Sequence, residues 1–184
     1  MTQSLHKGES NKKTDKLESD ETSQLDLKLL DGVQQRFHFV LSCKDIDDLH
    51  RVLEPLLMKM NPEDSLLIFV ESTDVAEESA KVFRHRVGKL CGSALKGHAE
   101  VECNKAVDKF LVDKNALVTD DHVLRRRPDI VSDFILNLNV PRSISDYLCR
   151  AKALIGRKQM VTVFDKEMDT CGLTNKYKRH LHLR

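Results

Sequence analysis

The sequence predicts an α/β fold with a mainly parallel sheet and helices on both of its faces. Short apolar runs recur along the chain, at Ser65–Val70, Ala116–Thr119, Phe134–Val140 and Met160–Phe164. Such runs are typical of strands that are covered on both faces. Stretches with apolar residues at helical spacing lie between them, and this alternation favours parallel strands joined by helical crossovers. The 184 residues suffice for one domain with a hydrophobic core.

The first half of the chain is expected to supply two strands, each followed by a helix. The first strand opens at Gly32, and a capped helix over residues 42–60 follows it. After the strand that begins at Ser65, a second helix starts at Ser72 or Thr73 with a stripe of apolar residues. Gly92 suits the end of that helix.

The second half contains a strand–turn–helix unit, from Asp133 to Lys158, on which most of the functional interpretation depends. Pro141 ends its strand, because proline cannot donate to a strand ladder, and Ser143 or Ser145 caps its helix. The other expected elements are a weak strand at 94–96, a helix at about 100–110 and strands at 116–119 and 160–164.

The two ends of the chain differ in composition from the domain predicted at residues 32–166. Residues 1–31 are polar and charged, and we expect them to form a disordered tail. Residues 167–184 form a basic tail, which is either a solubilising terminus or an RNA-binding or nuclear-import segment. The net charge is only +1, so a nucleic-acid partner has to be argued from local patches.

Composition also limits the compartment and the chemistry. No apolar run approaches the roughly 20 residues that span a bilayer, so no membrane association is expected. The five cysteines are scattered without a CxxC pair, which is typical of free thiols in the cytoplasm, with the nucleus as the alternative. No cofactor is expected, and His180 and His182 lack the further ligands of a metal site.

Five segments occur along the chain in an order that a known family shares. They are Gln34-Gln35-Arg36-Phe37, Leu67–Ser72, Lys96-Gly97 with Phe110, Asn115–Asp121, and Pro141 followed by Tyr147-Leu148-Cys149-Arg150. In this order they resemble motifs of the C-terminal RecA-like domain of DEAD-box RNA helicases, nearest to the Vasa group. The resemblance covers roughly residues 32–165 and implies a RecA-like three-layer fold in a single domain.

The chain departs from the family at the residues that carry catalysis. Where motif VI of the family ends in two arginines that face the ATP phosphates, this chain has Ala153 and Gly156, and only the first arginine survives, as Arg150. Alanine and glycine cannot neutralise charge in a phosphoryl-transfer transition state. The chain also has no phosphate-binding Walker loop and no Asp-Glu-Ala-Asp sequence. We therefore expect a degenerate domain that is not an enzyme.

The RNA-contacting motifs are altered too. Val101 and Asn104 stand where the family has a Gln-x-x-Arg pair, and motif V becomes a segment from Asp120 to Asp129. Phosphate contacts need only charge and reach, so basic residues near these motifs are candidate RNA contacts. They are Arg125, Arg126, Arg127, Arg150, Lys152, Arg157 and Lys158. A solvated loop or helix surface explains the same residues.

Three functional hypotheses remain open on the sequence. The first is a non-catalytic helicase-C-like binding module that docks onto single-stranded RNA or onto an RNA-helicase or ribonucleoprotein partner. The second is a subunit that completes a composite RNA-dependent ATPase with a separate RecA-like domain. The third is another nucleotide fold, such as a flavodoxin-like domain, for which Ser42-Cys43-Lys44 is a poor phosphate turn because it lacks glycine.

Overall fold

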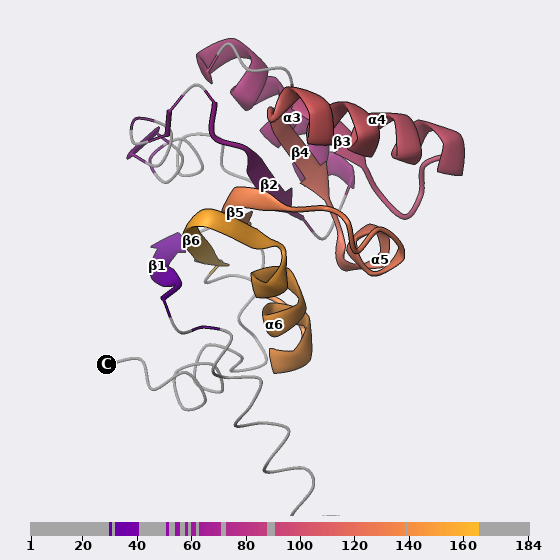
Figure 1. The fold of residues 1–184 in the computed structure, drawn as a ribbon. Coiled ribbons are helices and arrows are strands. Elements are labelled where there is room, and N and C mark those ends of the chain that lie inside the picture. The colour runs from indigo at the N-terminus through magenta and orange to yellow at the C-terminus, as the bar shows by residue number, and fades with distance from the viewer. Residues whose placement is uncertain are drawn as a thin grey trace, which may run out of the picture.

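A computed structural model describes residue 30 and residues 32–40, 64–70, 73–87, 91–138 and 140–165, with scattered positions between 51 and 63. The strands are β1 (Gln34–Val40), β2 (Leu66–Phe69), β3 (Cys91–Ala94), β4 (Ala116–Thr119), β5 (Ser132–Asn137) and β6 (Leu154–Asp165). The helices are α3 (Thr73–Val87), α4 (Glu100–Asp113), α5 (Asp121–Arg126) and α6 (Ile144–Lys152) (Figure 1).

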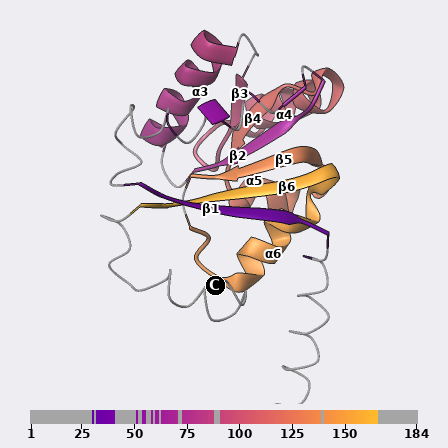
Figure 2. The same ribbon diagram turned by 90° about the vertical axis from the view of Figure 1, so that its left-hand side faces the viewer.

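The strands form one 6-stranded sheet in the order β1-β6-β5-β2-β4-β3. Every neighbouring pair in it is parallel. Figure 2 shows β1, β6, β5 and β2 lying one after another, with α6 beside β1 and β6. Parallel neighbours need crossover connections, which the helices provide. The predicted α/β architecture with a parallel sheet is confirmed.

The core lies on both faces of the sheet, as alternate residues of β2 show. Leu66 and Ile68 belong to one buried cluster, which also contains Ala76 of α3. Leu67 and Phe69 belong to a second buried cluster, which contains side chains of α4, α5 and α6. All four of these β2 side chains are buried. A central strand with no exposed face explains why its sequence is apolar throughout.

The strand predicted at 94–96 begins earlier than expected. It is β3, which starts at Cys91, so Gly92 lies in a strand instead of at a helix end. Gly92 pairs with Leu117 of β4. A Cβ built at Gly92 would lie 3.6 Å from Cδ1 of Leu117 and 3.7 Å from the Cβ of Ala106, which are ordinary van der Waals contacts. Gly92 is therefore a residue of the sheet, and the prediction that it ends a helix was wrong.

Helix α4 and strand β4 match their predictions with small changes at the helix end. Helix α4 starts at Glu100 as expected and continues to Asp113. Lys114 then adopts a left-handed conformation with φ 47°, and its backbone N–H donates to the carbonyl of Phe110 at 2.9 Å. This is a standard way to end a helix. It turns the chain directly into β4.

The last two strands differ most from expectation. Strand β5 ends at Asn137 instead of Val140, and β6 starts at Leu154, ahead of the predicted 160. Ser132 pairs with Leu154 but Phe134 pairs with Gln159, so the four residues 155–158 of β6 lie opposite the single residue Asp133 of β5 and form a bulge. Arg157 and Lys158, expected along or just past α6, therefore lie in β6, and their side chains are outside the described part of the chain.

Other expectations also fall outside the described residues. These are the tail at 1–31 apart from residue 30, most of the helix at 42–60, and the basic tail at 167–184 with His180 and His182. Among the helices that the structure describes, none combines the length and apolarity of a bilayer span.

Candidate functional site

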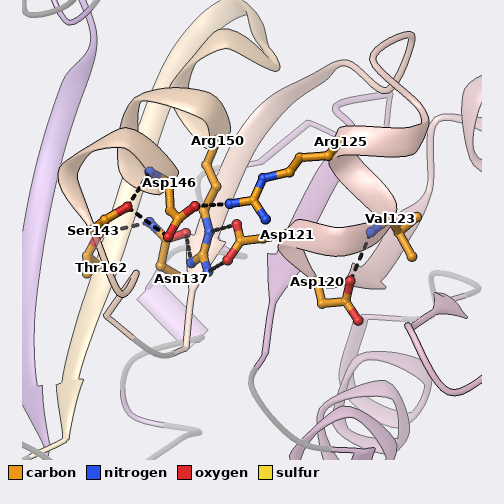
Figure 3. Close-up of polar contacts among 9 residues, drawn as sticks. All are labelled: Asp120, Asp121, Val123, Arg125, Asn137, Ser143, Asp146, Arg150 and Thr162. Carbon is orange, nitrogen blue, oxygen red and sulfur yellow. Dashed lines mark hydrogen bonds and ion pairs between the residues drawn. The ribbon is translucent and has the colours of Figure 1, made fainter.

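The candidate site lies at the carboxyl ends of the central strands. Phe69 of β2 pairs with Thr119 of β4 and with Asn137 of β5, so these three strands end at the same level. The segments that follow β4 and β5, which contain α5 and α6, meet there (Figure 3). In open parallel sheets, ligand sites form beyond this edge. The side chains that gather there are mostly arginines and carboxylates.

Arg150 of α6 lies at the centre of this edge and is only 1% exposed. Its Nε and Nη2 donate to the two carboxylate oxygens of Asp121, each at 2.7 Å. Its Nη1 donates to Oδ1 of Asn137 at 2.9 Å. The guanidinium also lies over the ring of Phe69, 4.4 Å from the centroid. A charge this deeply buried is tolerated because it is paired bidentately, hydrogen-bonded and stacked on an aromatic ring.

The buried polar contacts continue across the sheet. Asn137 donates from Nδ2 to the hydroxyl of Thr162 on β6 at 2.9 Å. The hydroxyl of Tyr147 donates to Oε1 of Gln35 on β1 at 2.7 Å. Burial raises the pKa of Tyr147 above its ordinary value, and a hydrogen bond with Thr162 acts in the opposite direction. Side chains from α5, α6, β5, β6 and β1 are thus joined by polar contacts in the interior.

The three consecutive arginines lie at the outer side of this edge, and each has an acidic partner. Arg125 pairs with Asp146 of α6, and Arg126 pairs with Glu100 of α4 at 2.7 Å. Arg127 pairs with Asp108 of α4 at 2.8 Å and bidentately with Asp129, at 2.9 and 2.7 Å. We call these side chains, Arg125 to Arg127 with Glu100, Asp108, Asp129 and Asp146, the arginine cluster.

Hydrogen bonds within the arginine cluster shift the pKa values of Arg127 and Asp129. The bonds to Asp129 and Asp108 raise the pKa of Arg127 above its ordinary value. The bond from Arg127 lowers the pKa of Asp129. Arg127 also donates to Oδ1 of Asn104 at 3.2 Å. The position where the resemblance implied an RNA-contacting arginine therefore carries an asparagine that holds Arg127.

A short capped helix positions the arginines. Asp120 accepts the backbone N–H of Val123 at 2.9 Å through Oδ1, which caps α5. Its Oδ2 accepts the backbone N–H of Lys96 at 2.7 Å, which ties the loop after β3 to α5. Val123 and Leu124 are buried, so α5 presents its arginines away from the core. The loop expected for residues 125–127 was wrong, because residues 121–126 form a short helix that Asp120 caps.

The aspartates at this edge act as structural partners. Asp120 caps α5, Asp121 holds Arg150, and Asp129 holds Arg127. At the opposite edge of the sheet, where β2 and β5 begin, Asp133 accepts the backbone N–H and the hydroxyl of Ser65 at 3.0 and 2.9 Å. Within the described ranges, no group of three or more His, Cys, Asp or Glu side chains is placed to hold a metal ion.

The structure separates the predicted RNA contacts into different environments. Arg125 and Arg126 are 59% and 55% exposed and Arg127 is 22% exposed. Lys152, the last residue of α6, is exposed. The prediction that Arg150 lies at the surface was wrong, because Asp121 and Asn137 bind its guanidinium in the interior. RNA binding by the exposed residues stays a prediction.

The other motif positions are also placed. Ala153, where the family has an arginine finger, is buried at 4% exposure as the residue that ends α6. Val101, where the family has an RNA-contacting glutamine, is 65% exposed on α4. A sequence signal for Asp121 and Asp146 was present, because each stands four residues before an arginine in its own helix. Their pairing across helices was not visible in that spacing.

Comparison with known proteins gives structural matches only. No protein-family model matches the chain, and no curated protein sequence matches it. The chain is similar to the E. coli DEAD-box protein SrmB, in a structure bound to regulator of ribonuclease activity A. The two are 20% identical with a TM-score of 0.66, over 80% of this chain and 85% of that one.

Two further solved structures show the same likeness. A variant of the S. cerevisiae Dbp5 C-terminal domain, bound to Gle1 and IP6, is 19% identical with a TM-score of 0.62, over 82% of this chain and 85% of that one. Mss116p DEAD-box helicase domain 2, bound to an RNA duplex, is 14% identical with a TM-score of 0.59, over 72% of this chain and 54% of that one. The chain has the RecA-like α/β fold of DEAD-box C-terminal domains.

Proposed function

We propose that this chain is a non-catalytic, helicase-C-like binding module that acts in RNA or ribonucleoprotein complexes. The observation that carries the proposal is the environment of Arg150, the one arginine that remains of motif VI. Arg150 is 1% exposed and committed to Asp121 and Asn137. An arginine that contacts phosphate has to reach out of its own domain. The buried guanidinium of Arg150 is held by three protein hydrogen bonds, and the two positions of the family's arginine fingers carry Ala153 and Gly156.

The positions of the lost fingers support the same proposal. Ala153 is buried against the core, and Gly156 has no side chain to offer. Neither position supplies the positive charge that stabilises phosphoryl transfer. The Arg150 contacts instead hold α5 and α6 together at the edge of the sheet. The retained scaffold is therefore better suited to docking than to catalysis.

The structural relatives support docking as a use of this fold. SrmB is seen bound to regulator of ribonuclease activity A, the Dbp5 domain to Gle1 and IP6, and Mss116p domain 2 to an RNA duplex. By this analogy, the binding module docks onto single-stranded RNA or onto an RNA-helicase or ribonucleoprotein partner. Among the predicted RNA contacts, Arg125, Arg126 and Lys152 are exposed. The cytoplasm, or the nucleus, is the compartment that fits such a partner.

ATP turnover is the measurement that tests the non-catalytic part. The purified chain is assayed with single-stranded RNA, alone and mixed with the separately expressed first RecA-like domain of a DEAD-box protein. We expect no RNA-stimulated turnover above that of the first domain alone. A tenfold stimulation of turnover by this chain would overturn the proposal and support the composite ATPase instead.

RNA binding by the same preparation tests how the module docks. Fluorescence anisotropy with a labelled single-stranded oligomer gives the affinity across a salt series. Binding whose logarithm falls linearly with log salt indicates phosphate contacts. A Kd weaker than about 10⁻⁴ M, the weak end of non-specific binding, would exclude RNA docking and leave protein docking.

A further inference from the structure

The arginine cluster is a basic run whose charge is already compensated within the domain. Its three arginines face four carboxylates, which leaves one net negative charge among these side chains. The carboxylates come from three places: Glu100 and Asp108 from α4, Asp146 from α6, and Asp129 from the segment after α5. A basic run that is neutralised in this way does not create the positive potential that attracts a polyanion.

Two of these ion pairs have an exposed arginine. Both partners in the Arg126–Glu100 pair are more than half exposed, at 55% and 66%. In the Arg125–Asp146 pair the arginine is 59% exposed, whereas Asp146 is only 13% exposed. Exposed pairs of this kind add little net stability, because water competes for both partners and salt screens them. A phosphate oxygen can therefore replace a carboxylate oxygen on these arginines.

Arg127 is the most firmly held of the three arginines. It is 22% exposed and has two carboxylate partners and Asn104. The hydrogen bonds fix its guanidinium beside Asp129. Arg125 and Arg126 extend toward different helices, α6 and α4, so their positive charges lie on two sides of α5. Successive phosphates of a flexible RNA strand can bind to arginines that are separated in this way.

We propose that Arg125, Arg126 and Arg127 form a masked site for single-stranded RNA, and that Glu100, Asp108 and Asp146 set its affinity by competing with phosphate for the arginines. This proposal rests on the proposed function, since it specifies how the module's RNA contact is regulated. It assigns the acidic side chains a role in suppressing RNA binding. The unmodified chain is then a weak RNA binder whose affinity rises when the carboxylates are neutralised or displaced.

The test replaces the masking carboxylates by amides of the same shape, in the triple variant Glu100→Gln, Asp108→Asn and Asp146→Asn. We expect the affinity for a labelled single-stranded RNA to rise at least tenfold at physiological salt. Each freed arginine that meets a phosphate adds about 0.7 to the slope of log affinity against log salt for single strands. The triple variant frees Arg125 and Arg126, while Arg127 keeps its pair with Asp129, so the slope should steepen by about 1.4.

A matched control separates unmasking from a general change in charge. Asp74→Asn, Glu102→Gln and Asp113→Asn remove the same three charges from exposed positions on α3 and α4, outside the arginine cluster. We expect this control to raise the affinity less than threefold. Adding Arg125→Gln, Arg126→Gln and Arg127→Gln to the unmasked variant should return the affinity to that of the unmodified chain.

Several outcomes would overturn the proposal. One is an unmasked variant that binds RNA no more tightly than the matched control. Another is equally tight binding of a poly-glutamate peptide, which would assign the site to acidic protein segments. If the triple variant fails to fold, Glu100→Gln alone is compared with Glu102→Gln, and equal affinities would also reject it. The ATP turnover assay uses the unmodified chain, so the test of the proposed function and the test of the masking are independent.

Discussion

Arg150 and Arg126 make the same kind of ion pair in opposite environments. Arg150 is 1% exposed and holds Asp121 with two hydrogen bonds of 2.7 Å. Arg126 is 55% exposed and holds Glu100 with one bond of 2.7 Å. In the interior, a lost partner leaves an uncompensated charge, whereas at the surface water replaces it. The Arg150–Asp121 pair is therefore required for stability, whereas the Arg126–Glu100 pair, with similar hydrogen-bond geometry, can be exchanged for contacts with water.

The largest expected effect is the loss of the buried guanidinium. Arg150→Ala should lower the free energy of unfolding by about 3–5 kcal/mol, because it leaves Asp121 and Asn137 without their partner. Urea denaturation measures the change. Arg126→Ala is the matched control and should change the free energy by less than about 0.5 kcal/mol. Equal costs for the two variants would contradict the distinction between interior and surface pairs.

The next effect concerns the buried hydroxyl of Tyr147. Tyr147→Phe leaves Oε1 of Gln35 without its donor and should cost about 1–2 kcal/mol at neutral pH. The folded pKa of Tyr147 lies above its ordinary value of 10.0, so its contribution to stability is complete below that pH and lost as pH rises above it. The difference between the two proteins in thermal unfolding should therefore change above about pH 10. A pH-independent difference would indicate that Tyr147 does not titrate in this range.

A gain in stability is expected from a substitution of Thr119, whose buried hydroxyl has no hydrogen-bond partner among the described residues. Thr119→Val removes an unsatisfied polar atom at nearly constant volume and should raise the free energy of unfolding by up to about 1 kcal/mol. Urea denaturation measures the change, and Thr162→Val serves as the control. Thr162 accepts from Asn137, so its loss should destabilise the protein. Destabilisation by Thr119→Val would reveal a partner for the hydroxyl in solution.

The smallest effect is the titration of Asp129 in the arginine cluster. The bond from Arg127 lowers its pKa below the ordinary value of 3.8, so the stability that this pair contributes is present above that pH and is lost as pH falls below it. In the Arg127→Gln variant we expect the pKa of Asp129 to return to its ordinary range. Carboxyl chemical shifts followed by NMR through the acid range measure both values. An unchanged pKa in the variant would contradict the assignment of Arg127 as the cause.

Elements that depend on local sequence could be predicted well. Strand β4 was expected at 116–119 and is found there, because its apolar side chains suit a strand covered on both faces. Ser143 was a candidate cap, and its hydroxyl accepts the backbone N–H of Asp146 at 3.1 Å. Helix α5 could not be predicted from its six residues alone. It is held in place by the cap from Asp120 and by ion pairs with α4 and α6, and the ion pairs form only in the folded domain. The bulge at 155–158 was likewise invisible, because it is defined only by pairing with β5.

The sequence by itself determined the class of fold and the presence of charged residues around α5 and α6. It also has Asp121 four residues before Arg125, and Asp146 four residues before Arg150, a spacing that permits an ion pair within each helix. The tertiary structure joins the helices instead: Asp121 binds Arg150, and Asp146 binds Arg125. Side-chain spacing describes neighbours along one helix, but burial and the approach of a second helix decide which guanidinium a carboxylate meets. As a result, Arg150 lies in the interior, whereas Arg125 and Arg126 lie at the surface.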